Sequence, residues 1–155
     1  MNKPLLDLEK DDFFNKLKHA DKGLICPCCD RFAKIYSRKL TATTCRELIC
    51  LYNTGGDFNY IHASKLVFEG LACCDIGKAK YFGLVVLGDN ENPEKKTSGC
   101  WKLTSAGIRF VKGFLSIPKY VHIYNDKVLS FDDSEELYIQ DCLGNKFNYQ
   151  ELMAK

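Results

Sequence analysis

The chain has 155 residues, of which 46% are hydrophobic and 27% are charged. This balance supports a buried core and excludes a disordered, collagen-like or coiled-coil chain. No apolar run approaches the about 20 residues of a membrane-spanning helix, and the start, MNKPLLDLEKDD, lacks the apolar stretch of a signal peptide. We therefore expect a cytoplasmic protein that has no membrane partner.

The formal net charge of +2 is unevenly distributed along the chain. Residues 31–125 carry 14 basic and 7 acidic side chains, a net charge of +7, whereas residues 1–30 carry −1 and residues 126–155 carry −4. Because concentrated positive charge attracts anions, we expect an anion-binding surface in the middle of the chain.

Residues 1–40 are expected to form an N-terminal helix followed by a cysteine turn. Apolar periodicity and acidic first turns predict a helix over Leu8–His19, which Gly23 ends. The turn Cys26-Pro27-Cys28-Cys29 then joins two short extended arms, and the second arm continues over residues 33–40.

Residues 41–115 are expected to form a trio of helices, a two-stranded wing and a closing helix. Thr41 is a good N-cap for a helix to about Tyr52, and Ser64 and Thr104 can cap the helices expected over 65–69 and 105–113. Gly83 can end a helix in the left-handed conformation. The polar residues 88–99 cannot enter a core, so they predict a hairpin tip. The other expected elements are helices over 65–69, 73–82 and 105–113 and strands over 60–62, 84–87 and 100–103.

Residues 116–155 are expected to form a small acidic β-hairpin module with a terminal helix. Alternation predicts strands over 120–124 and 128–131, joined by the turn Asn125-Asp126, and a third strand over 137–139. Asn148 with Glu151 is the capping box of a helix over 149–153.

Two stretches of the middle segment, KYFGLV at 80–85 and WKLTSAGIRF at 101–110, resemble the LxxxGLI…WxLTxxG signature of winged-helix DNA-binding domains. The resemblance implies an α+β fold with a winged helix-turn-helix core. In that family the third helix enters the major groove of double-stranded DNA, and the wing contacts the adjacent backbone.

Seven basic residues are candidates for this DNA contact. They are Lys78 and Lys80 at the end of the expected third helix, Lys95 and Lys96 on the expected wing, and Arg38, Lys39 and Arg46 from the preceding segment. The expected third helix has no Arg, Asn or Gln that could pair bidentately with a base edge, so we expect phosphate contact with weak sequence preference. The other interpretation of these side chains is a solvated surface.

A wider resemblance covers nearly the whole chain. The pattern CPxCxxxxKxYxR at 26–38, the wing, the segment 117–125 and the tail 139–153 are together similar to small proteins encoded by bacteriophages and prophages. The resemblance implies a viral origin without an assigned activity. A second hypothesis is a phage-encoded adaptor or inhibitor that binds a host or viral protein through the winged helix in the host cytoplasm. The acidic tail from Asp126 to Glu151 fits a module that avoids nucleic acid or imitates its charge.

The nine cysteines are an odd number in a chain without an export signal, which does not describe a disulfide framework. Cys26 and Cys29 have the C-P-x-C spacing with which two thiolates on a tight turn can bind one Zn²⁺ ion. Tetrahedral zinc needs two further ligands. The candidates are His19, His62, Cys45, Cys50 and the pair Cys73-Cys74, none with a diagnostic spacing. Two alternatives stay open, a glutaredoxin-like redox pair and unreactive thiols in a solvated turn.

Catalysis is not expected. The sequence has no Gly-rich phosphate loop, no GxSxG and no HExxH, and its three histidines are isolated from paired carboxylates. The acidic run over 132–136 could bind a divalent ion, but a solvated turn between strands is the commoner structure.

Overall fold

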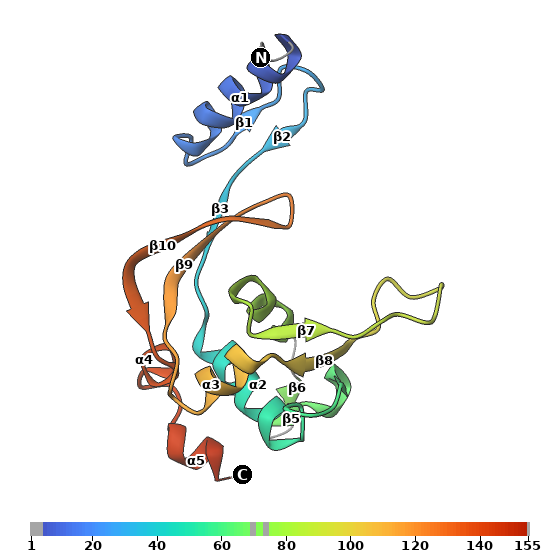
Figure 1. The fold of residues 1–155 in the computed structure, drawn as a ribbon, viewed down its shortest axis with the longest axis vertical. Coiled ribbons are helices and arrows are strands. Elements are labelled where there is room, and N and C mark those ends of the chain that lie inside the picture. The colour runs from blue at the N-terminus through green and yellow to red at the C-terminus, as the bar shows by residue number, and fades with distance from the viewer. Residues whose placement is uncertain (1–4, 69–70, 73–74, 155) are drawn as a thin grey trace.

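The computed structural model describes residues 5–68, 71–72 and 75–154 and shows a mixed α+β protein, which confirms the predicted fold class (Figure 1). The helices are α1 (Leu5–Lys18), α2 (Ala42–Asn53), α3 (Ser105–Val111), α4 (Ile139–Leu143) and α5 (Tyr149–Met153), with two 3₁₀ helices, η1 (Ala63–Lys65) and η2 (Ile76–Phe82). The strands are β1 (Leu24–Ile25), β2 (Phe32–Ala33), β3 (Tyr36–Arg38), β4 (Ile61–His62), β5 (Val67–Phe68), β6 (Leu71–Ala72), β7 (Val85–Leu87), β8 (Cys100–Leu103), β9 (Ile117–Tyr124) and β10 (Lys127–Leu137). None of the helices within these ranges combines the length and hydropathy that a bilayer crossing requires.

The middle of the chain builds a three-stranded antiparallel sheet with the strand order β4–β8–β7. The helices α2 and α3 and the 3₁₀ helix η2 pack around it. The predicted caps are confirmed: Thr41 Oγ1 accepts the N–H of Thr44 at 3.3 Å, and Thr104 Oγ1 accepts the N–H of Gly107 at 3.0 Å. Gly83 ends η2 with a φ of 72°, the left-handed conformation in which glycine carries no steric penalty.

One hydrophobic core joins the middle and the C-terminal parts of the chain. Leu48 of α2 and Phe110 of α3 are fully buried, and the same cluster contains Ile139 and Leu143 of α4 and Leu152 of α5. The boundary expected near residue 115 therefore lies inside a shared core.

A second antiparallel sheet has the order β10–β9–β3, so it pairs a strand from residues 1–40 with the C-terminal hairpin. The predicted hairpin turn at Asn125-Asp126 is confirmed, with φ values of 49° and 63° at the two residues. The hairpin itself is longer than expected, and β10 contains two register shifts.

The N-terminal unit, formed by α1, β1 and β2, lies at one end of the long axis of the molecule (Figure 1). It contacts the second sheet through aromatic rings, since the ring centroids of Phe14 and Tyr124 are 5.8 Å apart in an edge-to-face arrangement. The helix predicted over 8–19 is confirmed, with Leu17 only 1% exposed.

The prediction of a helix over 65–69 is wrong for the part of this range that the structure describes. His62, rather than Ser64, caps a single turn, because His62 Nδ1 accepts the N–H of Ser64 at 3.1 Å, and that turn ends at Lys65. The chain then continues as β5, which pairs with β6.

Two further elements differ from the prediction. The expected strand over 137–139 does not form, because β10 ends at Leu137 and α4 begins at Ile139, where Asp141 accepts the N–H of Tyr138 at 2.9 Å. The helix expected over 73–82 is a 3₁₀ helix from Ile76 onward, and its expected start at Cys73 and Cys74 lies outside the described residues.

Candidate nucleic-acid interface and cysteine turn

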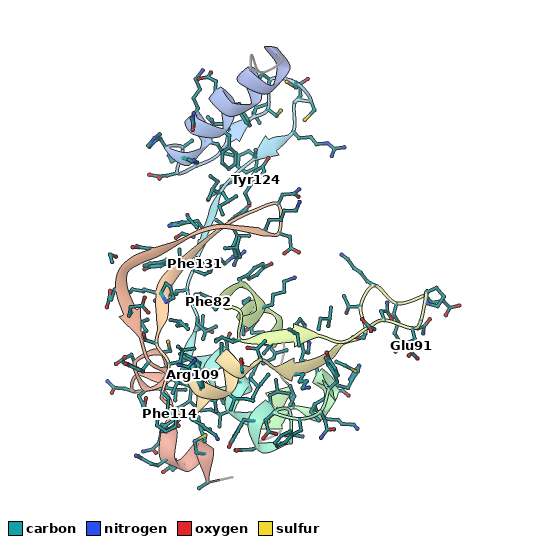
Figure 2. The ribbon with its side chains drawn as sticks, viewed as in Figure 1. Phe82, Glu91, Arg109, Phe114, Tyr124 and Phe131 are labelled. Carbon is teal, nitrogen blue, oxygen red and sulfur yellow. The ribbon has the colours of Figure 1, made fainter. Side chains whose placement is uncertain are left out.

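A polar loop over residues 88–99 joins β7 to β8 and projects from the body of the protein, with Glu91 at its outer end (Figure 2). Asn90 Nδ2 donates to the carbonyl oxygen of Lys95 at 2.6 Å, which braces the loop from within. Lys95 and Lys96 are both exposed on it.

One basic side chain contacts Asp126, and two more act through their charge on Asp126 or on its neighbour Tyr81. Lys80 Nζ of η2 donates to Asp126 Oδ2 at 3.4 Å, and the hydroxyl of Tyr81 donates to Asp126 Oδ1. The charge of Lys96 acts on the same carboxylate, and the charge of Arg38 acts on Tyr81. We name Arg38, Lys80 and Lys96 the basic cluster.

The hydrogen bond from Tyr81 favours the ionised form of Asp126. Together with the charge of Lys80, this bond holds the pKa of Asp126 below its usual range, and it raises the pKa of Tyr81. Asp126 is thus an ionised carboxylate at neutral pH, with 68% of its side chain exposed. The cluster already holds one anionic group at the protein surface.

Lys78 and Lys95 lie beside this cluster along the chain and are exposed. Lys78 Nζ is 3.0 Å from Asp75 Oδ1 at the start of η2, so its charge is partly balanced within the same helix. Lys95 is the neighbour of Lys96 on the projecting loop. Of the four lysines on η2 and the loop, Lys80 and Lys96 act on the carboxylate of Asp126.

Lys39 and Arg46 do not join the basic cluster. Lys39 follows Arg38 at the end of β3, where successive side chains point to opposite faces, and its charge acts on Cys142 of α4. Arg46 is 5% exposed and lies over the ring of Phe147 at 5.6 Å. The expectation that Arg46 extends the phosphate-binding surface is wrong, because its guanidinium is buried beneath the C-terminal segment.

Tyr81 and Asp126 are the residues of this surface that the sequence did not indicate. They are 45 positions apart, and Asp126 was expected only as a turn residue. Its position beside η2 follows from the pairing of β3 with β9, which no local pattern encodes.

The cysteine turn joins β1 to β2 and is closed by backbone hydrogen bonds. The N–H of Cys26 donates to the carbonyl oxygen of Arg31 at 2.8 Å, and the N–H of Asp30 donates to that of Cys26 at 2.9 Å. The backbone N–H groups of Cys28 and Cys29 donate to Cys26 Sγ, which also hydrogen-bonds with both of their thiols. These contacts lower the pKa of Cys26, so the turn favours a thiolate there.

No other expected zinc ligand joins this turn in the described part of the chain, where no group of three or more His, Cys, Asp or Glu residues could hold a metal ion. Four of the other candidates lie on other elements: His19 follows α1, His62 is in β4, and Cys45 and Cys50 are on α2. The remaining candidates, Cys73 and Cys74, are outside the described residues. Of the expected zinc ligands, the structure brings together Cys26 and Cys29.

A second thiol pair lies in the core, between α2 and α4. Cys45 is fully buried, and its hydrogen bond with Cys142, with burial, raises the pKa of Cys45 well above its usual value. The same hydrogen bond lowers the pKa of Cys142. All seven described cysteines are free thiols.

No protein-family model, no curated protein and no solved structure matches this chain. Its own residues and their geometry are therefore the basis on which its function is inferred.

Proposed function

We propose that this protein binds double-stranded DNA through the phosphate backbone, using the basic cluster and the 88–99 loop. The packing of α2, η2 and α3 around the hairpin β7–β8, whose polar tip projects, supports a winged-helix interpretation of residues 41–115 (Figure 1). The tip carries Lys95 and Lys96, and η2 carries Lys78 and Lys80.

The observation that carries the proposal is the contact of Lys80 with the exposed carboxylate of Asp126, beside which the charges of Arg38 and Lys96 also act. Arg38, Lys80 and Lys96 come from β3, η2 and the 88–99 loop, and their charges act on Asp126 or on the hydroxyl that binds it. A phosphate presents the same kind of charged oxygen to Lys and Arg. The surface thus has the chemistry that a DNA backbone requires.

The carboxylate of Asp126 competes with phosphate for Lys80 but does not prevent phosphate from binding. The Lys80–Asp126 pair has side chains that are 42% and 68% exposed, and exposed ion pairs contribute only about 0–1 kcal/mol. A DNA phosphate can therefore replace Asp126 as the partner of Lys80 at little cost. Because η2 presents no Arg, Asn or Gln, binding is expected to show weak sequence preference.

The proposal is tested by the anisotropy of a fluorescent duplex at low salt. Lys95→Ala/Lys96→Ala is expected to weaken binding to all duplex sequences alike, and Asp126→Asn is expected to strengthen it. Lys119→Ala/Lys146→Ala removes the same amount of positive charge outside the proposed DNA-binding surface and is the matched control. Absence of wild-type binding, or an equal loss in both lysine pairs, contradicts the proposal.

A second function, an adaptor for a host or viral protein, is favoured by the outer edge of β10. This strand lies at the end of its sheet in the described part of the chain, and Val128, Leu129 and Phe131 on it are 40%, 39% and 42% exposed. An exposed strand edge with apolar side chains is a template for a partner strand. Either function fits a reducing compartment such as the host cytoplasm, in which free thiols persist.

The two functions are separated by comparing retention of host proteins on the immobilised chain with the duplex assay. The adaptor function predicts a stoichiometric protein partner that Leu129→Lys abolishes, and no binding of DNA. DNA binding that Leu129→Lys leaves unchanged, without such a partner, excludes the adaptor function.

A further inference from the structure

We propose that the cysteine turn is half of a zinc site that two copies of this chain complete, each giving the thiolates of Cys26 and Cys29 to one Zn²⁺ ion. This inference goes beyond DNA binding and does not depend on it. It assigns both a metal and an oligomeric state to the N-terminal unit.

The thiols of Cys26 and Cys29 lie close together. They lie on one closed turn, hydrogen-bond with each other, and line the same hollow of about 370 Å³. Tetrahedral zinc with Zn–S bonds of about 2.3 Å holds two sulfurs about 3.8 Å apart, which is the spacing of hydrogen-bonded thiols. The N–H groups that point at Cys26 Sγ come from the turn itself, so they also support the metal-bound thiolate.

The site requires ligands from outside this half-set. Structural zinc is almost always four-coordinate, and no group of three or more His, Cys, Asp or Glu residues in the described part of the chain is placed to hold the ion. A second copy related by a two-fold axis offers the same two thiols in the same geometry, and such an axis is the commonest symmetry of protein dimers. The turn lies in the N-terminal unit, at one end of the long axis of the molecule (Figure 1).

The side chains around the turn fit a paired arrangement. Ile25 and Phe32 face each other across β1 and β2 and are 59% and 58% exposed, so two copies would bury four apolar side chains beside the metal. Arg31 and Lys34 line the same hollow as the thiols. Zinc with four thiolates carries a charge of about −2. The cations of both copies balance it.

The test combines metal analysis with molar mass by light scattering, on protein purified under reducing conditions without added metal. We expect one Zn²⁺ per two chains in a dimer, conversion to a monomer by a strong chelator, and recovery of the dimer on titration with Zn²⁺ that saturates at one ion per two chains. Chelation of the wild-type chain keeps the test valid even where a cysteine variant folds poorly.

Three double cysteine variants identify which thiols bind zinc. Cys26→Ser/Cys29→Ser is expected to give a zinc-free monomer, whereas Cys50→Ser/Cys100→Ser, which removes two other half-buried thiols, keeps both zinc and dimer. Cys73→Ser/Cys74→Ser is also expected to keep both. One zinc per monomer, no zinc uptake, a dimer that survives chelation, or loss of zinc in the Cys73/Cys74 variant overturns the proposal. Absence of DNA binding does not contradict the zinc-site proposal.

Discussion

Gly107 explains the T-x-x-G spacing at the start of α3. Thr104 Oγ1 accepts the N–H of Gly107 at 3.0 Å and donates to the carbonyl oxygen of Gly83 at 2.6 Å. A Cβ on Gly107 would lie 2.0 Å from the carbonyl oxygen of Leu84. Only glycine therefore lets α3 lie this close to the backbone that connects η2 to β7.

Gly107→Ala is expected to lower the free energy of unfolding by about 1–3 kcal/mol, because the backbone must move to admit the methyl group. Gly77→Ala is the matched control, since its Cβ would meet only the ring of Trp101 at 3.3 Å. That variant is expected to stay within about 1 kcal/mol of the wild type. Urea unfolding measures both, and equal effects contradict the packing described for α3.

Single residues were predictable where their partners are close in sequence. Thr41, Thr104 and Asn148 were all predicted as caps, and each accepts the N–H three positions ahead. The burial of Arg46 was not predictable, because it depends on Phe147 at the other end of the chain. A surface cation and a buried one have the same local sequence signature.

At the level of elements, the same distinction separates correct from wrong predictions. The helix after Thr41 and the hairpin turn at Asn125-Asp126 follow from caps and turn residues and are confirmed. The wrong helix after Ser64 depended on a cap that His62 supplies instead. The contact of η2 with the hairpin β9–β10 was beyond sequence reasoning, since it requires the pairing of β3 with β9.

This contact gives a pH dependence whose sign is defined. The pKa of Asp126 is lowered by the hydrogen bond from Tyr81 and the charge of Lys80, so its contribution to folding is full above the ordinary pKa of 3.8 and is lost as the pH falls through the lower folded value. Asp126→Asn is therefore expected to lower the free energy of unfolding at neutral pH, by an amount that shrinks in acid. Urea unfolding between neutral pH and pH about 2 measures it. A difference that is constant with pH contradicts the contact.

At the level of the whole molecule, the three segments expected from the sequence are joined more closely than expected. β3 pairs with β9, and α4 and α5 share the core of α2 and α3. The predicted boundaries followed the order of the expected elements, with a winged helix between an N-terminal helix and a C-terminal hairpin. The core follows apolar contacts instead, and these cross the boundary near residue 115.

Leu143→Ala in α4 is expected to destabilise residues 41–115 as well, by about 2–5 kcal/mol, because Leu143 is 2% exposed in the shared core. Trp101 of β8, the one tryptophan of the chain, is the fluorescent probe, and circular dichroism reports all helices. Both transitions are expected to move together. Phe114→Ala, at a side chain that is 75% exposed, is the control. An unfolding transition of Trp101 fluorescence that Leu143→Ala leaves unchanged contradicts a shared core.

The dependence of DNA affinity on salt tests the central claim most directly. The logarithm of the association constant is expected to fall linearly with the logarithm of salt concentration, with a slope of about −0.9 for each phosphate contact. Lys95→Ala/Lys96→Ala is expected to reduce the magnitude of that slope by up to ~1.8, equally for unrelated duplex sequences. A wild-type affinity that does not respond to salt, or a slope that the variant leaves unchanged, would contradict backbone binding by this surface.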